Sequence, residues 1–92
     1  MENNIFLDKV VGFLVRDTKM DYEKDEIQFP FSYSPDSCSR PYVLLPLFYL
    51  PPHRLLLFSE YCKNVYGLTE QEIEYVWDQY RTIIIDKIEN GR

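Results

Sequence analysis

Hydrophobic residues recur at helical spacing near the start of the chain. Ile5, Phe6, Val10, Phe13 and Leu14 repeat every three or four positions, and charged side chains fill most of the positions between them. A period near 3.6 residues is typical of a helix with one apolar face. The pattern predicts a first helix over residues 4–15, with these five side chains facing the core.

A second stretch with the same period covers residues 53–66. Two prolines precede it, and Gly67 follows it where a helix often ends in a left-handed residue. We expect a helix whose apolar face consists of Leu55, Phe58, Tyr61, Cys62 and Val65.

The third stretch has the most complete start signal. Thr69 and Glu72 fit a capping box, in which each side chain bonds the other residue's backbone amide. Leu68 and Ile73 occupy the two positions of a hydrophobic staple. The sequence predicts a helix over residues 70–89. Its apolar stripe consists of Ile73, Val76, Trp77, Tyr80, Ile83, Ile84 and Ile88.

Trp77 lies at the centre of that stripe. Large aromatic side chains dominate the cores of small domains. We therefore expect Trp77 to be buried against the other helices, near Phe13, Leu14, Phe58 and Tyr61.

The segment between the first two helices is less regular. Residues 17–26 carry five acids and two lysines without apolar periodicity, which predicts a solvated connector. Residues 27–33 alternate between apolar and polar side chains, as in a strand. Pro30 cannot donate to a ladder, so the alternation predicts an extended segment that forms at most a short edge strand.

Residues 41–52 are rich in aromatic and aliphatic side chains and contain four prolines. Either a short helix kinked near Pro46 or a buried extended segment fits them. The whole sequence predicts a mainly α fold. We expect a single domain, residues 1–92, of three to four helices with an irregular aromatic and Pro-rich crossover.

Net charge narrows the choice of partners. The chain carries −5, and residues 17–26 and 69–92 each contribute −3. An acidic surface repels phosphate, so we expect no binding to nucleic acid or to anionic membranes. The longest apolar stretch, residues 42–50, is too short to span a bilayer. No basic segment precedes an early apolar run, so we expect a cytoplasmic protein.

Catalytic and metal-binding patterns do not emerge from the sequence. His53 is the single histidine, and its position does not fit a nucleophile–base motif. Cys38 and Cys62 are too far apart for a CxxC pair. They could form a disulfide, although two reduced thiols fit a cytoplasmic chain better. We expect no enzyme activity, no metal and no cofactor.

Acidic side chains line the outer side of the third predicted helix. Glu70, Glu74 and Asp78 follow one another at spacings of four residues, and Tyr75 is expected beside them. Carboxylates around an exposed aromatic suit a basic protein surface. The predicted partner-binding residues are Glu70, Glu74, Tyr75 and Asp78, helped by Asp21, Glu23 and Asp25 of the connector.

Three functions agree with this profile. The first is an inhibitor, specifically an immunity protein that neutralises a bacterial nuclease-type toxin by covering a basic surface. The second is a phage-encoded inhibitor of a host defence enzyme. The third is a regulatory or adaptor subunit that docks through the apolar Pro-rich segment. Size and charge favour the first, by analogy with proteins of this general kind.

Overall fold

The computed structural model describes residues 2–21, 23, 26–32 and 52–90. Within these residues the fold is mainly helical, as predicted, with a two-stranded antiparallel sheet. The elements, in chain order, are α1 (Glu2–Asp17), β1 (Lys19–Asp21), β2 (Glu26–Gln28), α2 (Pro52–Tyr66) and α3 (Glu70–Asn90).

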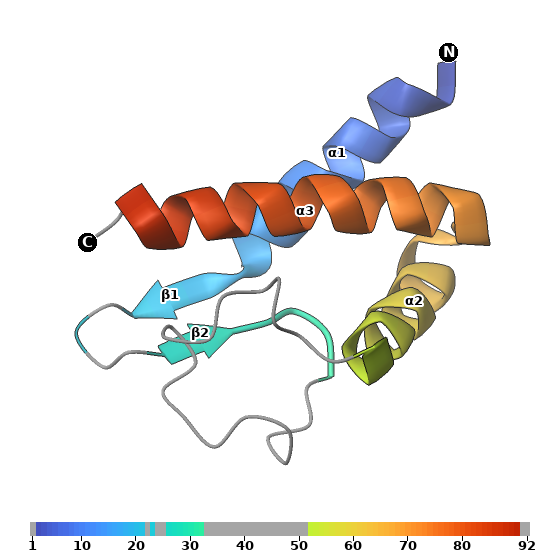
Figure 1. The fold of residues 1–92 in the computed structure, drawn as a ribbon. Helices are drawn as coiled ribbons and strands as arrows, with labels where there is room; N and C mark the ends of the chain where they lie inside the picture. Colours follow the sequence, from blue (N-terminus) through green and yellow to red (C-terminus); the bar gives the residue numbers. More distant parts are fainter. Residues whose placement is uncertain (1, 22, 24–25, 33–51, 91–92) are drawn as a thin grey trace.

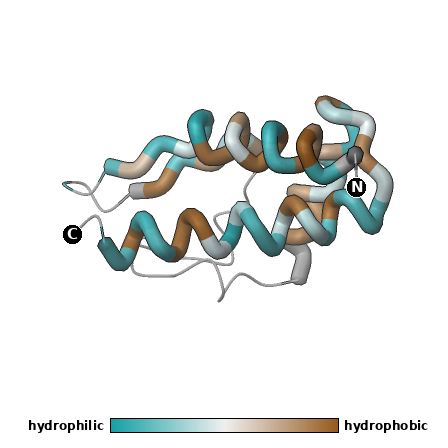
Figure 2. Tube along the Cα trace, turned by 90° about the horizontal axis from the view of Figure 1, so that it is seen from above, coloured by the Kyte–Doolittle hydropathy of each residue, from teal (hydrophilic) through white to brown (hydrophobic). Residues whose placement is uncertain are grey.

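Helix α3 packs against both α1 and α2. Figure 1 shows α3 crossing α1, with the β1–β2 hairpin below its C-terminal half and α2 below its N-terminal half. Figure 2 shows hydrophobic positions recurring along both α1 and α3 between hydrophilic ones. The core lies where the apolar faces of the three helices meet the hairpin.

The start of α3 forms as its sequence predicts. The Thr69 amide donates to Glu72 Oε1 at 2.9 Å, and the Glu72 amide donates to Thr69 Oγ1 at 3.3 Å. Leu68 and Ile73 are both buried, so the hydrophobic staple is also present. These contacts fix where α3 begins and therefore which of its faces points outward.

Helix α2 also ends where the sequence predicts, just before Gly67. Gly67 has a φ of 66° and its amide donates to the Lys63 carbonyl at 3.2 Å. The bond from Gly67 to Lys63 is that of an αL cap, and the Leu68 amide also donates to the Cys62 carbonyl at 3.4 Å. Only three residues therefore separate α2 from α3, and the two helices pack as neighbours.

Residues 17–26, predicted as a solvated connector, include the end of α1, the strand β1 and the first residue of β2. β1 pairs with β2 in the register Lys19 with Gln28, Met20 with Ile27 and Asp21 with Glu26. The predicted edge strand at 27–33 is confirmed only at its beginning, because β2 ends at Gln28. The alternation was informative nevertheless: Ile27 and Phe31 are buried.

Thr18 joins α1 to the hairpin and is the buried polar residue of the described core. Its hydroxyl donates to the Leu14 carbonyl at 2.7 Å, and the Tyr80 hydroxyl hydrogen-bonds to the same Thr18 oxygen. Both hydroxyls are thereby satisfied away from water, which removes the cost of burying them. This contact ties the turn after α1 to the middle of α3.

Aromatic rings from α2, α3 and the segment after β2 form the centre of the core. The Phe31 and Phe58 ring centroids lie 5.3 Å apart at 90°, and the Phe58 and Tyr80 centroids lie 5.7 Å apart. The remaining buried hydrophobic residues are Leu7, Val10, Val11, Leu14, Ile27, Cys62, Leu68, Ile73, Val76, Ile84 and Ile88.

The predicted core face of α1 is partly wrong. Ile5, Phe6 and Phe13 are 67%, 47% and 39% exposed. Leu7 and Val11 are buried in their place, together with the correctly predicted Val10 and Leu14. Short aliphatic side chains let α1 approach α3 closely, so the aliphatic face packs inward and the aromatic face stays outside.

Three other predicted core residues are less buried than expected. Trp77 is half-buried, not central: its ring lies 4.9 Å from Phe58 and 6.3 Å from Tyr80. Tyr80 takes the central position: it is fully buried, its ring stacks on Phe58 of α2 and its hydroxyl bonds Thr18 after α1. Val65, next to the last residue of α2, and Ile83, in the second half of α3, are exposed. The predictions for residues 41–51 lie outside the described residues.

Candidate interaction surface on helix α3

The three predicted carboxylates of α3 are exposed and lie on one side of the helix. Glu70, Glu74 and Asp78, called the acidic row below, are spaced one turn apart. The row is partly neutralised: Lys63 Nζ lies 3.7 Å from Glu70 Oε1, and Arg81 Nη2 lies 3.2 Å from Asp78 Oδ1. Glu74, in the centre, makes no ion pair among the described residues. Exposed pairs of this kind stabilise little, so the carboxylates stay accessible to a partner.

Tyr75 does not stand free beside the acidic row. Its hydroxyl donates to Asp8 Oδ1 of α1 at 2.9 Å, and its ring packs against the core. That hydrogen bond raises the Tyr75 pKa, because the ionised phenolate could no longer donate to the carboxylate. The residue holds α1 against α3, and its role in a partner contact remains a prediction.

Trp77 is the aromatic side chain next to the acidic row. It follows Glu74 by three positions, so its half-buried ring lies beside that carboxylate. The indole also contacts Phe58 in an edge-to-face arrangement, with 4.9 Å between the ring centroids and 62° between the planes. Sequence reasoning assigned Trp77 wholly to the core. The spacing to Glu74 was the signal that could have placed it at the edge of this surface.

The acidic connector lies elsewhere. Asp21 is half-buried in β1 and Glu23 is exposed in the turn of the hairpin. Figure 1 shows the hairpin below the C-terminal half of α3, whereas the acidic row occupies the first half. The structure does not bring these acids into one surface with the row. Asp25 lies outside the described residues.

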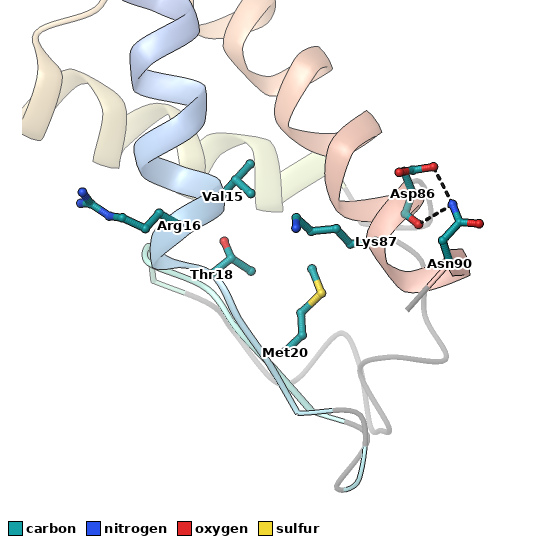
Figure 3. Close-up of a pocket in the computed structure, with 7 residues that line it drawn as sticks. All are labelled: Val15, Arg16, Thr18, Met20, Asp86, Lys87 and Asn90. Carbon is teal, nitrogen blue, oxygen red and sulfur yellow. Dashed lines mark hydrogen bonds between the residues drawn. The ribbon is translucent and has the colours of Figure 1, made fainter. Parts of the chain in front are cut away.

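A cleft of about 580 Å³ opens between the end of α1, β1 and the last turns of α3. Its walls are Val15, Arg16, Thr18, Met20, Asp86, Lys87 and Asn90. In Figure 3 the Arg16 side chain extends away from Lys87, so the two cations do not converge. The Asn90 amide donates to the Asp86 carboxylate at 2.7 Å.

The described thiol is not placed for chemistry. Cys62 is a free cysteine, fully buried, and burial raises its thiol pKa to about 12. It is therefore protonated and inert at neutral pH. Cys38 lies outside the described residues. Among the residues that the structure describes, no group of three or more His, Cys, Asp or Glu side chains is arranged to hold a metal ion.

None of the helices in the described part of the chain combines the length and the apolar composition needed to cross a lipid bilayer.

Comparison with known proteins places the chain in no family. No protein-family model matches it, and neither the curated proteins nor the solved structures gave a match. The functional argument therefore depends on the surface of the molecule alone.

Proposed function

We propose that this protein is a small inhibitor that binds a basic surface of another protein through the acidic row. Its target would be a bacterial nuclease-type toxin, which makes it an immunity protein in function. The observation that carries the proposal is the row itself: three exposed carboxylates on one side of α3, bordered by the half-exposed Trp77.

Charge explains why a nuclease is the preferred target. A nuclease cleft binds phosphate groups and is therefore basic, and a row of carboxylates offers it the same sign of charge as a nucleic-acid backbone. The net charge of −5 would add long-range attraction to such a cleft. Trp77 would supply apolar contact area. Tryptophan is enriched among the residues at the centres of interfaces that contribute most to binding.

The rigidity of α3 supports the same proposal. Its first turn is fixed by the capping box and its centre by the buried Tyr80. A surface that is ordered before binding loses little conformational freedom on association. The acidic row could therefore meet its target without rearrangement.

Affinity capture from extracts of the native host tests the proposal. The baits are the wild-type chain, the row variant Glu74→Lys with Asp78→Lys, and a control variant, Glu60→Lys with Glu89→Lys. Both variants change the formal net charge equally, but Glu60 and Glu89 are exposed outside the acidic row. We expect the wild type and the control to retain a basic nuclease that the row variant loses.

The captured nuclease is then purified and assayed with and without an equimolar amount of the chain. We expect wild type to stop cleavage of nucleic acid and the row variant to leave cleavage running. Equal capture by the row variant, or a nuclease that stays active in the complex, would contradict the proposal.

A further inference from the structure

We draw no further inference here: the strongest candidate, the outer face of α1 around the exposed Phe6 and Phe13, carries none, because nothing in the part of the chain that the structure describes shows what covers it.

Discussion

Helices α1 and α3 bury similar faces and expose opposite ones. Each contributes mainly aliphatic side chains to their shared interface, such as Val10 and Leu14 from α1 and Val76 and Ile84 from α3. Outside, α3 carries the acidic row, whereas α1 carries the exposed Phe6 and Phe13 together with Lys9 and Arg16. The comparison teaches that the larger apolar face of an amphipathic helix is not always the one that packs inward.

The largest difference in the free energy of unfolding is expected between removing a buried aromatic ring and removing an exposed one. Tyr80→Ala removes a fully buried ring and should lower the free energy of unfolding by about 3–5 kcal/mol. Phe13→Ala, on the exposed side of α1, should cost less than about 1 kcal/mol. Urea denaturation of both variants measures the difference. Equal losses would mean that the outer face of α1 belongs to the core after all.

The next effect concerns the hydrogen bond that joins α1 to α3. Thr18→Val removes the hydroxyl shared by the Leu14 carbonyl and Tyr80, leaving a buried phenol without its partner. We expect a loss of about 1–3 kcal/mol in the free energy of unfolding. Thr82→Val is the control, because Thr82 donates to the Asp78 carbonyl on the exposed side of α3. It should change stability by no more than about 0.5 kcal/mol.

Replacing either of two glycines by alanine should change stability by a smaller amount, and the two changes should have opposite signs. Gly67 has a φ of 66°, so Gly67→Ala strains the end of α2 and should cost about 1–2 kcal/mol. Gly12 lies within α1, and an added Cβ meets no atom within 4 Å. Gly12→Ala should therefore stabilise the protein by about 0.5–1 kcal/mol. Thermal unfolding should show shifts of opposite sign, and shifts of the same sign would contradict the backbone assignment.

The smallest effect near neutral pH involves the buried thiol of α2. Burial raises the Cys62 pKa from 9.0 to about 12, so the folded chain keeps its proton while the unfolded chain loses it. Stability is unaffected below pH 9.0 and should fall as the pH rises toward 12. Cys62→Ala should make this alkaline fall shallower in urea titrations at successive pH values. An unchanged slope would show that the thiol is hydrated in the folded state.

The sequence was most informative where local chemistry determines the structure. The capping box at Thr69 and the glycine at position 67 predicted both ends of the α2–α3 turn, because those bonds involve only neighbouring residues. The acidic row was also predictable as an exposed set from its spacing along α3.

What the sequence could not determine depends on tertiary packing. Two faces of α1 have helical periodicity, and only the close approach of α3 selects Leu7 and Val11 over Phe6 and Phe13. The sequence did not predict β1, because its charged residues do not favour a strand by themselves and pair only when β2 lies beside them. Tyr75 could not be assigned to Asp8 without knowing that α1 lies beside α3.

The central claim is that the acidic row, and not net charge alone, is the surface that binds a basic partner. Its most direct test is the association rate of the captured partner, measured by surface plasmon resonance at low salt. We expect Glu74→Lys with Asp78→Lys to slow association by at least about tenfold, and the Glu60→Lys with Glu89→Lys control to slow it much less. If both variants slow association equally, net charge alone would explain binding and the claim would be contradicted.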